Sequence, residues 1–298
     1  MRLLIVSFVL STLFTACAGP SEKATDRASV VSNNTSLRVS GTTASRTLMT
    51  LRKGDAVEIL EKRGNWYRVR YDGDVEGWME ESTIMTEATF AKARELAASS
   101  AGLPVQNTAT TSNVANLRLE PGRTTPVLRR LGGNTRIEVL ERASTPRPGQ
   151  EGAWDVWYKV RVSPDEVGWL FSGLMDFDMP EQLAPYSEEH FYPAARVLKT
   201  VDDPVLGSVN WYVVAERKPG LDPHLDFSGI RVFTWDLTHH RYETAFRLRN
   251  LRGVYPLEVD TTQPVIVFRF SESISGGAKK VREFALRGVN VRETRRVS

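Results

Sequence analysis

Residues 57–61 read Val-Glu-Ile-Leu-Glu, residues 66–70 read Trp-Tyr-Arg-Val-Arg, and residues 77–78 read Gly-Trp. The first segment is rich in β-branched and apolar residues, and the second alternates aromatic or apolar residues with polar ones, which is the period-two pattern of a half-buried β-strand. An Asp-Gly pair at 72–73 separates the second segment from the third, and this pair tolerates the backbone of a tight hairpin turn. The stretch therefore predicts short antiparallel strands joined by tight turns.

The same stretch occurs a second time. Residues 137–141 read Ile-Glu-Val-Leu-Glu, residues 157–161 read Trp-Tyr-Lys-Val-Arg, and residues 168–169 read Gly-Trp. The first segment lies 80 residues after its counterpart and the other two lie 91 residues after theirs, so the second copy carries 11 extra residues. This insertion, around residues 144–154, is rich in Pro and Gly and predicts a loop between two strands.

Leu37-Arg38 opens the first copy and recurs as Leu117-Arg118 in the second. With the Gly turn, the Val-x-Ile strand, Trp-Tyr-x-Val and Gly-Trp in the same order, residues 31–86 and 113–178 closely resemble bacterial SH3-like domains. The resemblance implies two small barrels that bind cell-wall peptide or a protein partner. Five short strands in about 55 residues also favour a small closed barrel.

Two adjacent aromatic pairs are candidate ligand contacts: Trp66 with Tyr67, and Trp157 with Tyr158. Neighbouring residues on a strand point to opposite faces, so one member of each pair should lie in the core and the other outside. Aromatic side chains with polar edges suit sugar and peptide contacts. The outward member of each pair is therefore the better ligand candidate.

Three further residues are tentative ligand contacts. Arg38 and Arg118 could hold a peptide carboxylate bidentately, or could form a structural salt bridge or hydrogen bonds to loop carbonyls. Trp154 lies in the insertion, which is either a recognition loop or a tolerated surface insertion. We expect the rings of Trp78 and Trp169 to pack in the two cores.

The N-terminus has the pattern of a secretory signal peptide over residues 1–16: a basic residue followed by the apolar run 3–14. That run is shorter than the roughly 20 residues that span a bilayer. Residues 13–17 resemble a lipobox, which implies lipidation of Cys17, the only cysteine, and a lipidated tether over 17–30. The expected location is the cell envelope, bound to the membrane through this lipid anchor, and the outer membrane in a Gram-negative cell. Ordinary secretion is the alternative.

The rest of the chain divides by composition. Residues 87–112 predict a short helix, capped by Thr86, and a linker. Residues 179–204 predict a second linker, and residues 205–298 predict a β domain whose family we do not recognise. The expected fold is thus all-β: two small SH3-like barrels followed by a separate antiparallel β domain.

Several chemistries find no support in the sequence. A net charge of +3 is too mild to predict nucleic-acid binding. With Cys17 used as an anchor, the mature chain has no thiolate nucleophile and no cysteine metal site. Asp236, His239 and His240 lie close in sequence but lack a metal-ligand spacing, so we expect no metal, no cofactor and no catalytic residue.

Three functions are compatible with these observations. The first is a non-catalytic envelope lipoprotein that binds peptidoglycan peptide or an envelope protein. The second is a structural or assembly component of an envelope machine. The third is a hydrolase with its site in the C-terminal β domain, for which His224 and Asp226 are the residues to test.

Overall fold

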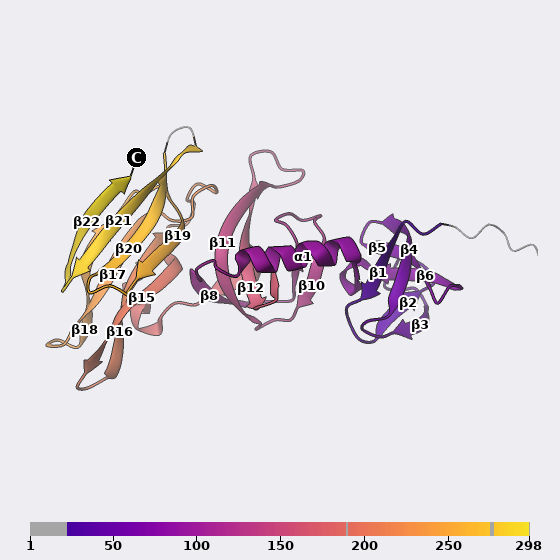
Figure 1. The fold of residues 1–298 in the computed structure, drawn as a ribbon, viewed down its shortest axis with the longest axis horizontal. Helices are drawn as coiled ribbons and strands as arrows, with labels where there is room; N and C mark the ends of the chain where they lie inside the picture. Colours follow the sequence, from indigo (N-terminus) through magenta and orange to yellow (C-terminus); the bar gives the residue numbers. More distant parts are fainter. Residues whose placement is uncertain (1–22, 189, 275–276, 298) are drawn as a thin grey trace, which may run out of the picture.

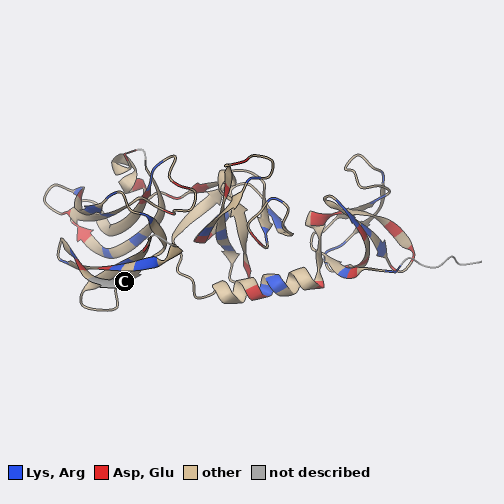
Figure 2. Ribbon diagram, turned by 90° about the horizontal axis from the view of Figure 1, so that it is seen from above, with Lys and Arg blue, Asp and Glu red and all other residues tan. Residues whose placement is uncertain are grey.

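The computed structural model describes residues 23–188, 190–274 and 277–297. Three β units follow one another along the long axis of the molecule, and one helix lies beside the middle unit (Figure 1). Basic and acidic residues are interspersed over all three units (Figure 2). Cys17 and the expected signal peptide lie outside the described residues. Within those residues, no helix is both long and apolar enough to cross a membrane.

The first unit is one antiparallel sheet in the order β3-β2-β6-β5-β4-β1-β7. Its end strands β3 and β7 each have a single neighbour, so the closed barrel expected from the strand pattern is wrong. The bounds are β1 (Asp26–Val30), β2 (Thr35–Arg38), β3 (Thr47–Leu51), β4 (Ala56–Arg63), β5 (Trp66–Tyr71), β6 (Val75–Glu80) and β7 (Ile84–Thr86), with a 3-10 turn η1 (Glu81–Thr83) before β7.

Strand β1 lies in the stretch that the sequence predicted to be tether. It pairs with both β4 and β7, and Ala28 and Val30 are buried on one side of the strand. Folded structure therefore starts before residue 31. A strand this short and polar is not recognisable in the sequence, because its burial comes from partners far along the chain.

The second unit repeats the strand order of the first, as β10-β9-β13-β12-β11-β8-β14. Each strand takes the sheet position of its counterpart, so the sequence repeat is a structural repeat. The bounds are β8 (Asn107–Thr111), β9 (Ala115–Arg118), β10 (Val127–Leu131), β11 (Arg136–Pro146), β12 (Trp154–Ser163), β13 (Glu166–Phe171) and β14 (Met175–Phe177), with a 3-10 turn η2 (Ser172–Leu174).

The insertion in the second copy extends a hairpin rather than forming a loop throughout. Strands β11 and β12 stay paired out to Pro146 and Trp154, and only the residues between those two lie outside the strands. The hairpin is therefore longer than its counterpart β4–β5 and projects beyond the sheet (Figure 1).

The two Gly-Trp pairs occupy equivalent places, but their rings lie outside the cores. Tyr67 pairs with Met79 and Tyr158 pairs with Leu170, and Met79 and Leu170 are fully buried. Because side chains alternate along a strand, the preceding tryptophans face the other side of each sheet. Trp78 is nonetheless buried as expected, although outside the apolar cluster of its unit, whereas the expected core position of Trp169 is wrong.

Cationic side chains cover these outward rings. The Arg63 guanidinium lies 5.1 Å from the Trp78 ring centroid, and Lys159 Nζ lies 5.3 Å from that of Trp169. Trp78 is buried, whereas Trp169 remains half-buried. The rings are therefore held by cation–π contacts on the outer face.

Helix α1 (Glu87–Ser100) joins the first two units. Thr86 caps it, because its side chain accepts a hydrogen bond from the Thr89 amide at 3.0 Å. Ala97 packs with Leu140 and Val167, and Arg161 Nη2 donates to the Ser100 carbonyl at 2.8 Å. The C-terminal half of the helix is therefore fixed to the second unit.

The third unit consists of two four-stranded antiparallel sheets, β15-β16-β17-β18 and β19-β20-β21-β22. They pack face to face, with Phe246 and Phe284 at 5.4 Å between ring centroids. The bounds are β15 (Phe191–Asp203), β16 (Gly207–Arg217), β17 (Gly229–Asp236), β18 (Arg241–Leu248), β19 (Gly253–Asp260), β20 (Ile266–Ser273), β21 (Lys279–Arg287) and β22 (Asn290–Val297), preceded by a 3-10 helix η3 (Glu181–Tyr186).

Strand β15 occupies half of the segment 179–204 that was expected to be a linker. Its long pairing with β16 makes it an edge of the sandwich, so this unit begins earlier than residue 205. The second and third units share one continuous apolar core, while the first unit has a core of its own. The chain is thus one two-unit body joined through α1 to a smaller unit.

Candidate functional site

A cleft of about 840 Å³ lies between the first and second units. Strand β10 of the second unit contacts η1 of the first beside it. The first unit contributes Thr43, Lys62, Gly64, Asn65, Trp66, Glu80, Glu81 and Ser82, and the second contributes Val114, Asn116, Arg118, Arg123, Thr124, Val127, Arg130, Trp157, Phe171 and Leu174. Three of the candidate ligand residues, Trp66, Arg118 and Trp157, are therefore brought to one site.

Trp66 presents a partly exposed indole to the cleft, while its neighbour Tyr67 packs against the core of the first unit. Gly41 lies directly against the indole: a Cβ at that position would be 3.1 Å from Trp66 Cγ. Lys62 Nζ lies 5.1 Å from the Tyr67 ring centroid. The alternation of the strand thus directs the tryptophan, not the tyrosine, toward the cleft.

In the second copy both members of the aromatic pair are buried, each only 2% exposed. Tyr158 lies in the core, where burial raises the pKa of its hydroxyl. Trp157 faces the cleft, but its Nε1 donates to Thr145 Oγ1 at 3.0 Å and its ring meets Phe171 edge-on at 5.5 Å. The expectation of one exposed member is wrong here, because the long hairpin and Phe171 cover the indole.

The two repeat arginines hold loop carbonyls. Arg38 Nη1 donates to the Ser45 carbonyl at 2.7 Å, and Arg118 Nη1 donates in the same way to the Thr125 carbonyl. Arg118 also lines the cleft, where burial lowers its pKa and the charge of Glu81 partly opposes that effect. Arg38 is not among the cleft residues, so the repeat places only one of the two at this site.

The cleft has more positive than negative charge available to a ligand. Lys62 is paired with Glu81 at 2.6 Å, and Arg123 is paired with the buried Asp155. Arg130 projects from β10 into solvent, and within the described residues no acceptor or carboxylate is bonded to it. Sequence reasoning missed Arg130, because its position in an exposed strand gives no signal until the other unit is placed.

Trp154 lies away from the cleft, at the junction of the second and third units. Its ring meets the His224 imidazole edge-on, with centroids 4.3 Å apart, and Ser144 Oγ lies 3.2 Å from His224 Nδ1. The extended hairpin therefore contacts the third unit through Trp154, which has no counterpart in the first copy of the repeat.

His224 and Asp226, the residues considered for hydrolysis, both belong to this junction. Arg142 Nη1 donates to the Pro223 carbonyl at 2.7 Å and to Asp226 Oδ1 at 3.3 Å. Asp226 Oδ2 accepts the Tyr255 amide at 2.7 Å, and burial raises the pKa of this carboxyl. The contacts that the hairpin makes with His224 and Asp226 therefore join the second unit to the third.

Asp236, His239 and Glu243 place one potential ligand atom each within 4.8 Å of one another on the β17–β18 hairpin. The Asp236 carboxylate already pairs with His239 Nδ1 at 2.7 Å, and Glu243 pairs with Arg241 at 3.0 Å. His240, which the sequence grouped with them, hydrogen-bonds Asp203 instead. These groups therefore have protein partners.

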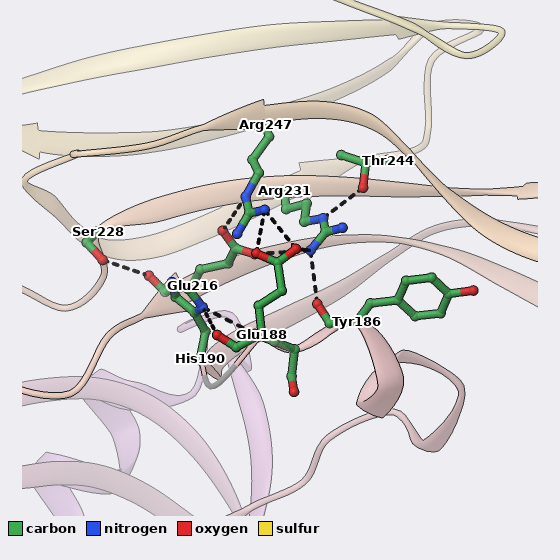
Figure 3. A network of polar contacts seen from close by, with 9 residues as sticks. Tyr186, Glu188, His190, Glu216, Ser228, Arg231, Thr244 and Arg247 are labelled. Carbon is green, nitrogen blue, oxygen red and sulfur yellow. Dashed lines mark hydrogen bonds and ion pairs between the residues drawn. The ribbon is translucent and has the colours of Figure 1, made fainter.

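A polar network on the outer face of the first sheet in the third unit was not foreseen from the sequence (Figure 3). Arg247 donates to Glu188 Oε2 at 2.9 Å and to Glu216 Oε2 at 3.1 Å, while Arg231 Nη1 donates to Glu188 Oε1 at 3.0 Å. The arginines lower the pKa of Glu188, Arg247 most. The network holds the segment after η3 onto the sheet, and its members are too far apart in sequence to form a motif.

Each of the two copies of the sequence repeat overlaps a match to a known protein family. Residues 33–85 match the family described as bacterial SH3 domain, and residues 123–172 match the family described as GW (Gly-Tryp) dipeptide domain. The resemblance of the repeats to bacterial SH3-like modules is thus confirmed. The C-terminal region matches no family, and no curated protein matches the chain.

Two solved structures from Trichomonas vaginalis align over most of the chain. NlpC2 is 11% identical, with 92% of this chain and 97% of that one covered, and NlpC1 is 10% identical, with 92% of each covered. The TM-score is 0.19 in both cases, so neither likeness bears on fold or function.

Proposed function

We propose that this chain is a non-catalytic cell-envelope protein whose first two units bind a cell-wall peptide in the cleft between them. The observation that carries the proposal is the cleft itself, because two units that match cell-wall-binding modules form it jointly. Its volume of about 840 Å³ falls within the range of small-ligand sites, about 300–1,000 Å³.

The lining suits a short peptide with free carboxylates. Arg118 and Arg130 offer guanidinium groups, which bind carboxylates through charge-assisted and often bidentate hydrogen bonds. Glu80 on the opposite wall can accept from an amino group. The Trp66 ring supplies an apolar face for the peptide backbone or an attached sugar.

Anchoring belongs to the same proposal. The lipobox-like residues 13–17 support lipidation at Cys17, which would fix the chain to a membrane of the envelope, the outer membrane in a Gram-negative cell. Labelling cells with an alkynyl fatty acid tests this: the wild-type protein should carry label, and Cys17→Ala should carry none. Label that persists in that variant would contradict the anchor.

Sedimentation with purified sacculi tests wall binding. The mature protein should pellet with sacculi, Arg130→Gln should pellet about tenfold more weakly because it loses one charge-assisted contact, and Arg52→Gln, an exposed arginine outside the cleft, should behave as wild type. Protein that stays in the supernatant would refute wall binding, and release of soluble fragments from the sacculi would refute a non-catalytic role.

A further inference from the structure

The third unit has a cavity of about 340 Å³ at one end of its sandwich, far from the cleft in sequence and in fold. Two cross-strand pairs line it. Lys199 of β15 lies opposite Trp211 of β16 on one sheet, and Ile266 of β20 lies opposite Leu286 of β21 on the other. The cavity is therefore the place where the two sheets end without filling the space between them.

Apolar side chains form the inner walls. Leu286 is buried, and Ile266 and Val265 are half-buried beside the exposed Pro264. One layer further in, the ring of Phe268 is stacked on the ring of Phe284, its cross-strand partner on β21, with the ring centroids 5.2 Å apart. Both rings are fully buried. The sandwich is filled at that layer, so the cavity does not extend further between the sheets past Phe268.

The polar side-chain groups of the cavity are all donors. Lys199 Nζ lies 3.9 Å from the Trp211 ring centroid, and Arg287 lies at the mouth. Within the part of the chain that the structure describes, neither cation has a carboxylate within ion-pair distance. Trp211 is only 6% exposed, and its buried Nε1 has no acceptor there. No lining side chain carries a carboxylate, amide or hydroxyl oxygen, although buried donors normally have a partner.

We propose that this cavity binds a single-chain amphipathic anion, with its aliphatic chain between the sheets and its acidic head group against Lys199 and Arg287. Such a ligand supplies what the cavity lacks, namely acceptor oxygens at a mouth with two cations and apolar atoms against Ile266 and Leu286. Lys199 is exposed and lies against the Trp211 ring, so its ammonium can pair with the head group beside the unpartnered Trp211 Nε1. A cationic amphiphile meets only like charge at the same mouth.

Isothermal titration of the mature protein with monomeric sodium decanoate tests the proposal. Wild type should bind decanoate, whereas decyltrimethylammonium, which has the same chain and the opposite charge, should not bind. Lys199→Gln and Arg287→Gln should each weaken decanoate binding about tenfold, since each removes one charge-assisted contact at an exposed position. Lys279→Gln, at the other end of β21, should bind as wild type.

The variants change exposed side chains, so we expect the folded state to be retained, and circular dichroism of each variant checks this. Absence of decanoate binding to the folded wild type would overturn the proposal. Equal binding of the two amphiphiles, or unchanged binding by both Gln variants, would overturn it as well, because the site would then not select the anionic head group.

Discussion

Arg142 of the second unit donates a hydrogen bond to Asp226 of the third, with 3.3 Å between Nη1 and Oδ1. Their side chains are 2% and 10% exposed, so the ion pair lies inside the junction. Trp154 and His224 make the second contact of the same junction. The insertion that distinguishes the second repeat therefore helps to join the second and third units through Trp154, which is not among the residues that line the cleft.

Removing one partner of the buried ion pair should weaken this junction strongly. Asp226→Ala leaves the Arg142 charge buried without a counter-ion, which typically costs about 3–5 kcal/mol. Urea unfolding should show that loss in the free energy of unfolding, and Asp165→Ala, in an exposed turn, should stay within about 0.5 kcal/mol of wild type. A loss below 1 kcal/mol for Asp226→Ala would mean that the pair does not stabilise the junction.

Asp203 should make the third unit sensitive to acid. Burial alone would raise the pKa of this carboxyl, but hydrogen bonds from Trp235, the Leu206 amide, His240 and the Val205 amide outweigh burial and lower it. The stabilisation is therefore fully present above the unfolded pKa of about 3.9 and is lost as pH falls below it. Urea midpoints measured from pH 5 to pH 3 should fall less steeply in Asp203→Asn than in wild type; parallel curves would refute this assignment.

The glycines of the two Gly-Trp pairs should resist substitution. A Cβ on Gly77 would lie 2.7 Å from Leu37 Cγ, and one on Gly168 would lie 2.7 Å from Leu117 Cγ. Gly77→Ala and Gly168→Ala should each lower the free energy of unfolding by about 1–3 kcal/mol through overpacking. Gly102→Ala, with no atom within 4 Å of the added carbon, is the control. Thermal unfolding that ranks all three alike would contradict the close approach.

Two tryptophans should separate stability from binding. Trp154→Ala removes the contact with His224 and should cost at least the roughly 0.5–1.5 kcal/mol of an aromatic pair, while sacculus binding is kept. Trp66→Ala should have the opposite profile, with weak binding and a smaller loss of stability, because its ring is partly exposed in the cleft. Parallel unfolding and sedimentation assays decide this, and binding lost in Trp154→Ala alone would place the site at the hairpin.

The repeat allowed much of the first two units to be predicted, since alternating residues identify strands and equal spacing identifies equivalent strands. The faces of Trp78 and Trp169 were not predictable, because a Gly-Trp pair does not reveal which neighbour faces the core. Strands β1 and β8 were missed because both are short and polar, and their burial depends on partners from elsewhere in the chain.

The candidate site could be predicted only in part. Trp66 and Arg118 were identified from their residue types and their places in the repeat. That they share one cleft depends on how α1 places the first unit beside the second, which no local pattern encodes. Arg130 and the cavity beside Trp211 likewise arise from packing between separate segments.

The central claim is that one cleft, built by both repeats, receives cell-wall peptide. The most direct measurement is a titration of the ¹⁵N-labelled protein with a soluble muropeptide, followed through the indole N–H signals of Trp66 and Trp157. The account predicts that both signals shift together and saturate at one concentration, with Trp154 unchanged and the response weakened in Arg130→Gln. Shifts confined to one unit and away from these indoles, or no shift at all, would contradict it.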